Sequence, residues 1–553
     1  MHGITRRRFF SLTARTAAGL GAARLLGPFP LALADELAPG IREIDAFVQR
    51  HIREMGAPGL TLGLADRNGP IAVRTYGHTD VKTGRKVSPD DLFEIGSITK
   101  SFVALCLLQL REQGKLDVNR PIREYLPWLK IESAYAPITV HHLLTHTSGL
   151  PNPLSLPAAP LWTAHAPGEH FHYCNLGYEI LGLLLRGLDG RPLRDIFRAR
   201  IFEPLGMTAS EGVISHDIRP RLAQSYWPVY DDRPFQRHGP ITEAPNLAMD
   251  NAAGCIASTP RDMSLYMKML LNQGRPLISK ETFALFTKPA IPAPGFGKDA
   301  GYGYGIAIQP VEGRTLLRHT GGMVSFSSAM QVDLDAGAGA FASVNASLQG
   351  YRPNAVAGYA LAALRTVPAP PPPEFDDPYK VPNAAEYVGT YTAPDGRKLV
   401  LTAADDRLEL VHKGEHLPLE RLAPDTFWVP DPAFALHPLA FERQGEKIVE
   451  ASHGADWYAG ERYTGPRTFE TPSEYLAYAG HYRNEDPWMG SARVVLRKGR
   501  LWLGGAPLLP LGSGLFRIGE EDHEPDRVRF EEIVNDRALR AVFSGIEFRR
   551  LDA

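Results

Sequence analysis

Apolar and polar residues alternate in two different ways along this chain. Before residue 367, stretches with a helical period are mixed with short strand-like runs. The clearest helix is predicted from Ser97 to Gln113, with Gly114 as a suitable C-terminal residue. Residues 102–108 of this helix are apolar on every side, so its middle should be buried all round.

After residue 373 the helical period nearly vanishes, and short alternating runs such as 398–402 and 492–496 take its place. This alternation predicts half-buried strands of an antiparallel sheet. A proline-rich segment at residues 367–374 separates the two parts and favours an extended polyproline II spacer. Because a single core rarely exceeds about 250–300 residues, a chain of 553 residues should contain two or more domains.

The tail repeats a Tyr-x-Gly-x-Tyr pattern, first at Tyr387–Tyr391 and again at Tyr478–Tyr482. Each copy leads into an apolar strand-like run, which indicates two related antiparallel modules. We expect these modules at residues 375–466 and 473–553, each a small up-and-down β-barrel without an exposed edge strand. The alternative is one larger β domain in which the second copy of the pattern occurs by chance.

Composition and charge exclude several classes of protein. With 44% hydrophobic residues the chain is not disordered as a whole, and 60 basic against 62 acidic residues give no electrostatic reason to expect nucleic acid. Three cysteines do not make a dense disulfide framework. Their apolar or small-residue surroundings favour inert core thiols at Cys106, Cys174 and Cys255.

The first 34 residues are predicted to be an export signal. Thr5–Phe10 contains three consecutive arginines, a weakly apolar stretch follows, and Ala32–Ala34 supplies the small residues that a signal peptidase accepts. The pattern resembles a twin-arginine signal, a bacterial route for folded proteins; the alternative is a basic disordered terminus. No other run approaches the ~20 apolar residues that span a bilayer. We therefore expect a periplasmic or secreted mature protein with no membrane span.

A Ser-x-x-Lys motif begins the predicted buried helix. Ser97 and Lys100 are three residues apart, which places both side chains on one helical face. A serine hydroxyl is a weak nucleophile until a neighbouring base takes its proton, and a lysine amine can do so when burial lowers its pKa. The motif alone is weak evidence for a catalytic site, since about one match is expected by chance in a chain of this length.

Two further motifs carry groups that fit the same chemistry. Tyr173 and Asn175 form a Tyr-x-Asn that enters an apolar helix, and a phenol can relay protons while an amide holds a carbonyl. His319–Gly322 follows an apolar run and precedes a predicted strand, and its small residues let a substrate backbone approach a strand edge. An isolated histidine here would be read as a surface turn residue.

The order Ser-x-x-Lys, Tyr-x-Asn, His-x-Gly is far less probable by chance than any one motif. In this order the chain resembles the serine β-lactamase and penicillin-binding-protein superfamily, on the branch of class C β-lactamases, D-aminopeptidases and related esterases. Longer stretches at 93–100, 138–151 and 202–207 support the resemblance, which covers about residues 42–365. It implies an α+β fold, an antiparallel sheet flanked by helices plus a helical lobe, for a hydrolase domain at residues 35–366.

The resemblance also implies catalytic roles. Ser97 would be the acylated nucleophile and Lys100 the base that activates it. Tyr173 would be a proton relay, or the base for deacylation. The backbone N–H groups of Ser97 and Gly322 would form the oxyanion hole.

Substrate-binding roles follow from the same resemblance. Asn175 would orient the acyl side chain, and His319, Thr320 and Gly321 would line the substrate. His319 stands where β-lactamases usually have a lysine that anchors a carboxylate. With an ordinary pKa near 6.5 a histidine is only partly charged at neutral pH. This weakens the case for β-lactam hydrolysis and favours an amide, a D-amino acid-containing peptide or an ester, including cell-wall-derived peptides, as in D-aminopeptidases.

Other interpretations remain open or weaker. A β-lactamase or D-Ala-D-Ala carboxypeptidase is the alternative within the family, and an inactive cell-wall-binding or sensor protein is the alternative of another class. His142 and His146 have zinc spacing but lack the glutamate of a zincin, no Gly-x-Ser-x-Gly occurs, and no cofactor or metal is expected. The tail tryptophans fit a barrel core or rim better than a binding surface; they are Trp457, Trp488 and Trp502.

Overall fold

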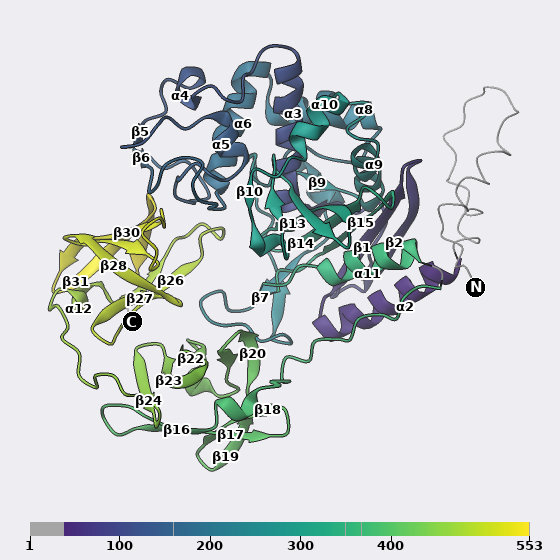
Figure 1. Cartoon of the computed structure of the whole chain (residues 1–553). Helices are drawn as coiled ribbons and strands as arrows, with labels where there is room; N and C mark the ends of the chain where they lie inside the picture. The colour runs from purple at the N-terminus through teal and green to yellow at the C-terminus, as the bar shows by residue number, and fades with distance from the viewer. Residues whose placement is uncertain (1–37, 159, 349, 367, 552–553) are drawn as a thin grey trace, which may run out of the picture. The chain divides into compact units, whose positions relative to one another are not determined.

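The computed structural model describes residues 38–158, 160–348, 350–366 and 368–551, which form two compact units (Figure 1). The first unit contains most of the chain up to Glu374, and the second contains the tail from Phe375. Two segments that precede the tail in sequence also belong to the second unit: the first excursion, residues 150–165, and the second excursion, residues 228–241. The expected export signal lies outside the described residues.

A nine-stranded antiparallel sheet is the centre of the first unit. Its middle strands are the most buried, because small and apolar residues point to both faces and both faces are covered. The strands lie in the order β10 (Ile291–Pro292), β11 (Gly301–Tyr302), β12 (Ala307–Val311), β13 (Arg314–Gly322), β14 (Ser327–Asp333), β15 (Ala338–Val344), β1 (Gly59–Asp66), β2 (Pro70–Asp80) and β3 (Arg85–Lys86).

Helices cover both faces of this sheet. They are α2 (Ala38–Met55), α9 (Pro260–Leu271) and α11 (Asn354–Arg365). Gln331 of β14 donates a hydrogen bond of 3.2 Å to the Asn354 carbonyl at the start of α11. Gly339 of β15 lies opposite Val332, the next residue along β14, and a Cβ there would touch Met267 of α9. Because successive strand residues face opposite sides, α11 and α9 pack on opposite faces.

A helical lobe completes the first unit. It contains α3 (Thr99–Glu112), α5 (Val140–Leu144), α6 (Asn175–Asp189), α7 (Leu193–Phe197) and α10 (Lys280–Phe286). Helix α3 packs against α6 and α10, and residues 102–108 are completely buried, as predicted. The flanked antiparallel sheet and the helical lobe confirm the predicted α+β fold.

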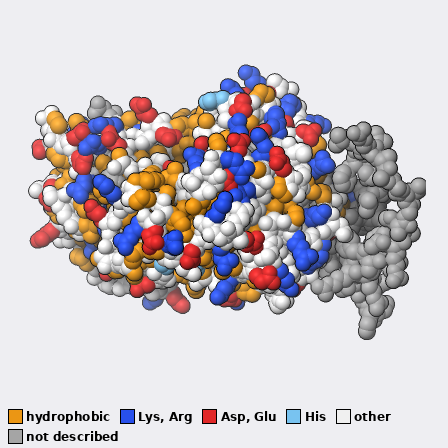
Figure 2. All heavy atoms as spheres, turned by 90° about the horizontal axis from the view of Figure 1, so that it is seen from above, with side chains coloured by type: hydrophobic (Ala, Val, Ile, Leu, Met, Phe, Trp, Pro, Cys, Tyr) orange, Lys and Arg blue, Asp and Glu red, His pale blue; other side chains and the backbone are white. Residues whose placement is uncertain are grey.

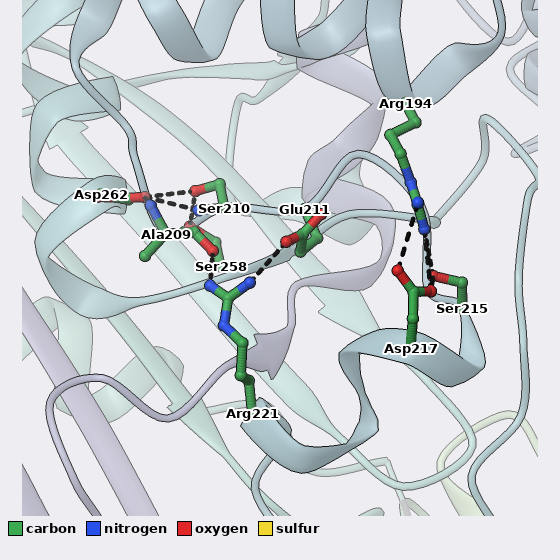
Figure 3. Close-up of polar contacts among 9 residues, drawn as sticks. All are labelled: Arg194, Ala209, Ser210, Glu211, Ser215, Asp217, Arg221, Ser258 and Asp262. Atoms are coloured by element: carbon green, nitrogen blue, oxygen red, sulfur yellow. Dashed lines mark hydrogen bonds and ion pairs between the residues drawn. The ribbon is translucent and has the colours of Figure 1, made fainter.

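A carboxylate network holds the chain around β9 (Ala257–Ser258) and the start of α9 (Figure 3). Asp262 accepts hydrogen bonds from the backbone N–H groups of Ala209 (2.9 Å) and Ser210 (2.8 Å) and from the Ser210 hydroxyl (2.8 Å). The Ser210 hydroxyl also lies 2.8 Å from that of Ser258. This network fixes the segment that immediately follows Ala253, whose carbonyl enters the site described below.

The second unit contains two antiparallel barrels, which confirms the predicted class of the tail. The strands of the first barrel lie in the order β19 (Glu415–Pro418), β18 (Arg407–His412), β17 (Lys398–Ala404), β16 (Gly389–Thr392), β24 (Asp456–Gly460), β23 (Lys447–His453), β22 (Leu439–Gln444), β21 (Thr426–Trp428) and β20 (Glu420–Ala423). Its two end strands, β19 and β20, are separated in the chain only by Leu419, so this sheet is nearly closed. The second barrel is closed and runs in chain order through β25 (Gly480–Arg483), β26 (Ser491–Arg497), β27 (Arg500–Leu503), β28 (Ala506–Gly512), β29 (Leu515–Ile518), β30 (Arg527–Val534), β31 (Arg537–Phe543) and β32 (Ile546–Arg550).

The repeated tyrosine pattern makes the same contact in both barrels. The Tyr391 hydroxyl donates a hydrogen bond of 2.8 Å to the Tyr387 carbonyl, and the Tyr482 hydroxyl donates one of 2.8 Å to the Tyr478 carbonyl. In each case the donor is buried at the first strand of its barrel. A buried phenol must satisfy its O–H group, so the pattern has a structural reason in each module.

Both excursions bind to the tail within the second unit. In the first excursion, Trp162 donates a hydrogen bond of 2.8 Å to the Pro525 carbonyl, and the Arg527 guanidinium lies 4.8 Å from the centre of its indole ring. In the second excursion, Asp231 pairs with Arg483 at 2.7 Å. The excursions are therefore held by groups of the second barrel.

Charges of both signs are interspersed on the face of the molecule drawn in Figure 2, in keeping with the near-zero net charge. Within the part of the chain that the structure describes, no helix has the length and apolar character that crossing a membrane requires.

Candidate active site

The two residues of the Ser-x-x-Lys motif are in direct contact. Lys100 Nζ lies 3.0 Å from Ser97 Oγ, 2.8 Å from Asn175 Oδ1 and 2.8 Å from the Ala253 carbonyl oxygen. An ammonium group has three N–H donors, so these acceptors satisfy all of them. In the neutral amine, Asn175 and Ala253 still hold two N–H groups, and the lone pair then points at the Ser97 hydroxyl.

Local structure explains both the exposure of the serine and the low basicity of the lysine. Ser97 lies in a short 3-10 turn, Gly96–Ile98, that leads into α3, and its side chain is partly exposed. Lys100 lies one turn later and is completely buried. Because burial disfavours the charged form, the pKa of Lys100 falls from its ordinary value to about 7.

The end of β13 next to this turn has a free edge. Strand β12 pairs with β13 only as far as Ala307 opposite Arg318, so the next four residues, 319–322, extend beyond it. The Met323 N–H donates to the Phe326 carbonyl at 2.9 Å and closes the β13–β14 hairpin. In the alternation of an antiparallel pair, the Gly322 N–H then points away from β14, toward the free edge.

Two glycines allow the turn and this strand to approach each other. Gly96 has a φ of +52°, and a Cβ on it would lie 2.9 Å from the Gly322 nitrogen. A Cβ on Gly321 would overlap the Ile95 carbonyl oxygen. Side chains at either position would separate Ser97 from the strand edge, so the backbone approach depends on glycine.

Tyr173 lies against the lysine and a buried histidine. Its ring centre is 4.9 Å from Lys100 Nζ and 4.2 Å from the centre of the His146 ring. Burial raises the pKa of Tyr173, although a hydrogen bond with Ser97 opposes this effect. At neutral pH the side chain is therefore a phenol and not a phenolate.

His146 fixes the chain that carries Tyr173. Its Nδ1 accepts a hydrogen bond of 3.0 Å from the Cys174 N–H, which places the ring proton on Nε2. No partner for Nε2 occurs among the described residues. His146 also has a φ of +58°, a conformation that costs energy outside glycine and that accumulates at functional sites. Burial lowers its pKa well below the ordinary value.

His319 is buried and neutral, which differs from the partial charge expected from the sequence. Its Nε2 lies 2.9 Å from the Tyr302 hydroxyl, and its Nδ1 lies 2.7 Å from the Thr320 carbonyl oxygen. The carbonyl can only accept, so Nδ1 carries the proton and Nε2 accepts from Tyr302. Burial and the nearby Lys100 lower the pKa of His319 to about 3.

Cys174, between Tyr173 and Asn175, has a structural role. Its sulfur accepts a hydrogen bond of 3.2 Å from the Gly177 N–H and caps the start of α6. All three cysteines are buried and none is in a disulfide, and burial raises the pKa of Cys106 and Cys255. Among the described residues, no group of three or more His, Cys, Asp or Glu side chains is arranged to hold a metal ion.

The structure brings the sequence-predicted residues of this site together and adds three that the sequence did not single out for it: His146, Ala253 and Tyr302. For His146 the one sequence signal was its position in a stretch that carries the family resemblance. Ala253 acts through its backbone, and Tyr302 comes from an unrelated segment, so no local pattern marks either of them.

Comparisons with known proteins identify the family of the chain. A model of the beta-lactamase family matches residues 44–365, more than half of the chain. The octameric penicillin-binding protein homologue from Pyrococcus abyssi has a similar structure, with a TM-score of 0.57 and 25% identity; the match covers 76% of this chain and 99% of that one.

Two curated proteins are similar in sequence. Protein flp of Staphylococcus aureus (strain N315) is 25% identical over 251 residues, which is 42% of this chain. The chain spans about half the length of that relative, 49%. The D-alanyl-D-alanine-carboxypeptidase/endopeptidase AmpH of Escherichia coli (strain K12) is 29% identical over 339 residues, 55% of this chain and 83% of AmpH.

Proposed function

This chain belongs to the beta-lactamase family, and we propose that it is a hydrolase that cleaves an amide or ester through an acyl-enzyme on Ser97. The observation that carries this proposal is the 3.0 Å contact between Lys100 Nζ and Ser97 Oγ. Because the pKa of Lys100 is about 7, a large fraction of the amine is neutral at physiological pH and can accept a proton.

In the acylation step, Ser97 Oγ attacks the substrate carbonyl carbon while its proton passes to Lys100 Nζ. The carbonyl oxygen gains negative charge and is held by the N–H groups of Ser97 and Gly322. Gly96, the first residue of the turn, has no side chain to separate the turn from the strand edge, which keeps these two donors close. The tetrahedral intermediate then expels the leaving group and leaves an ester on Ser97.

Tyr173 completes the proton path. Its raised pKa keeps it protonated, so its O–H can give a proton to the leaving amine or alkoxide and regain one through Lys100. In deacylation, water attacks the Ser97 ester and its proton returns along the same path. Of the two roles expected for Tyr173, the phenol form favours the relay over a phenolate base.

We propose an amide or peptide that contains a D-amino acid as the substrate, with esters as a further class. Asn175 would orient the acyl part from the lysine side of the site, and His319 with Thr320 and Gly321 would line the strand side. The Escherichia coli relative AmpH is a D-alanyl-D-alanine-carboxypeptidase/endopeptidase by name, which supports this class. The β-lactamase interpretation and the inactive binding protein remain the alternatives.

We also propose that the protein is exported by a twin-arginine signal at residues 1–34 and works in the periplasm or outside the cell. The tail would act on specificity through the two excursions, which it holds. The first excursion leaves the hydrolase part after Gly149 and returns at Ala166, shortly before Tyr173.

One substrate panel tests the proposal: nitrocefin, p-nitrophenyl esters, D-Ala p-nitroanilide and a D-Ala-D-Ala peptide, each with the native protein and with Ser97→Ala. We expect turnover of an amide or ester that Ser97→Ala abolishes. Binding without turnover of any of them would favour the inactive binding protein, and turnover of nitrocefin alone would favour a β-lactamase.

A further inference from the structure

His146 is a buried titratable side chain that the proposed mechanism does not use. It lies two residues beyond α5 and is completely buried. Its backbone has a positive φ, and its Nε2–H group has no hydrogen-bond partner among the described residues. A strained backbone and an unpaired buried donor both cost free energy, and strain of this kind accumulates at functional sites.

Three contacts of His146 meet on the segment that carries Tyr173. Its Nδ1 accepts a hydrogen bond of 3.0 Å from the Cys174 N–H, which follows Tyr173. Its carbonyl oxygen accepts one of 2.9 Å from the His172 N–H, which precedes Tyr173. The imidazole ring lies against the phenol ring, with 4.2 Å between the ring centres and 36° between the ring planes. One residue therefore holds the backbone on both sides of Tyr173 and also supports its ring.

The segment that His146 holds carries two groups of the site. The Tyr173 ring centre lies 4.9 Å from Lys100 Nζ, and its hydroxyl shares a hydrogen bond with Ser97. Asn175, two residues later, accepts a hydrogen bond of 2.8 Å from Lys100 Nζ. The phenol hydroxyl is at the end of the ring far from the backbone, so a small rotation of the ring moves the hydroxyl by the largest distance. Proton transfer from this hydroxyl therefore depends on the contacts that hold the ring.

The backbone contact and the ring contact need different properties of the side chain. An acceptor at Nδ1 requires a neutral imidazole, and burial and the nearby Lys100 lower the pKa of His146 well below its ordinary value. The contact with the phenol requires a flat ring. Asparagine offers an acceptor and tolerates the left-handed backbone, but it has no ring. His146→Asn therefore removes the support of the phenol and keeps an acceptor for the backbone.

We propose that His146 is the positioning residue for proton transfer from Tyr173 to the leaving group, an inference that rests on the proposed function. When the C–N bond of an amide breaks, its electron pair goes to the nitrogen, which takes the Tyr173 proton. Tyr173 then regains the proton that Ser97 gave to Lys100. A p-nitrophenolate, in contrast, leaves as a stable anion and needs no such proton. Misplacing the phenol should therefore slow the cleavage of an amide more than that of a p-nitrophenyl ester.

The test compares D-Ala p-nitroanilide with D-Ala p-nitrophenyl ester, which share an acyl group, in the native protein, His146→Asn, Tyr173→Phe and the double variant. The readout is the ratio of kcat/KM for the amide to that for the ester, since kcat/KM includes the departure of the leaving group. We expect His146→Asn to lower this ratio about 10- to 100-fold, because a displacement of about 1 Å costs up to about 100-fold in rate. Tyr173→Phe should lower the ratio at least as much. In that background His146→Asn should change it less than about twofold, because it acts through the missing hydroxyl.

The control is His51→Asn, at a buried histidine of α2 whose Nε2 lies 2.9 Å from the Tyr351 hydroxyl, and it should keep the native ratio. Thermal melts of each variant identify any loss of folding, and the ratio is independent of the amount of active protein. An unchanged ratio in His146→Asn, an equally large further fall in the Tyr173→Phe background, or native turnover of the ester alone would overturn the inference. Hydrolysis of either substrate by Ser97→Ala above the uncatalysed rate, or turnover of neither by the native protein, would instead overturn the proposed function, so the two failures are distinguishable.

Discussion

The hydroxyl of Tyr302 donates a hydrogen bond of 2.9 Å to Nε2 of His319. Together with the bond from Nδ1 to the Thr320 carbonyl, this contact fixes both ring nitrogens, while burial and the nearby Lys100 keep the imidazole neutral. His319, which stands where β-lactamases usually have a lysine, is thus a neutral side chain on β13. Changes of charge in the working pH range must come from another group.

That group is Lys100, whose pKa of about 7 predicts the pH dependence of activity. Below this pH the amine is protonated and does not accept the Ser97 proton, so kcat/KM should fall about tenfold per pH unit. Above it, kcat/KM should level off. Steady-state kinetics from pH 5 to 9 measure this acid limb of the pH profile of kcat/KM. Lys100→Met should lower kcat by at least about 10³-fold. In His319→Gln the midpoint should stay near 7, and a shift of the midpoint with that variant would assign the limb to His319.

Buried neutral histidines predict a loss of stability in acid. The pKa of His319 is about 3 in the folded state against an ordinary 6.5, so between these values the unfolded chain binds a proton that the folded chain does not. The contribution of each such histidine to the free energy of unfolding should therefore fall as the pH drops below 6.5, by up to about 1.4 kcal/mol per pH unit. His146 acts in the same direction, whereas buried Glu94, whose pKa is raised to about 8, acts in the opposite one. Urea unfolding of the native protein and of His319→Gln between pH 4 and 8 isolates the contribution of His319, and the same slope in both would contradict this prediction.

The matched tyrosines predict equal effects in the two barrels. Tyr391→Phe and Tyr482→Phe each remove the buried hydrogen bond to a tyrosine carbonyl. Tyr482→Phe also removes a long hydrogen bond of 3.5 Å from Arg550. Each should lower the free energy of unfolding of its barrel by about 1–3 kcal/mol. Tyr463→Phe, which removes an exposed hydrogen bond of 3.1 Å to the Pro466 carbonyl, is the control and should cost much less. Calorimetry of the tail transitions tests this, and equal small effects from all three variants would show that the buried bonds contribute little.

The first excursion predicts an effect of the tail on specificity. Trp162→Ala removes the hydrogen bond to Pro525 and the contact with Arg527, which weakens the attachment of the excursion to the second barrel. Relative kcat/KM values across the substrate panel should change several-fold, as they should when the chain is cut after Pro373. Trp128→Ala is the control, since Trp128 is 53% exposed. Unaltered kinetics on every substrate, in both Trp162→Ala and the truncated chain, would show that the modules are independent.

Sequence reasoning succeeded where the determinants were local. Ser97 and Lys100 are one helical turn apart, and the apolar run at 102–108 requires burial, so the nucleophile helix could be predicted. The Tyr-x-Gly-x-Tyr repeat likewise corresponds to one hydrogen bond in each barrel.

The rest depends on contacts that only the folded chain makes. The neutral state of His319 follows from burial and from the nearby Lys100, neither of which the ordinary pKa of histidine reveals. The Arg352 guanidinium lies where a Cβ of Gly322 would be, and this contact depends on the packing of α11 on β14 and β15. The association of the excursions with the tail is equally non-local, since Asp231 and Arg483 belong to distant parts of the chain.

The most direct measurement of the central claim is covalent labelling of the native protein with a fluorophosphonate or penicillin probe, followed by peptide mass mapping. The mechanism predicts one adduct on Ser97, with labelling and turnover both lost in Ser97→Ala and strongly slowed in Lys100→Met. The absence of an adduct on Ser97, together with full activity in Ser97→Ala, would contradict it.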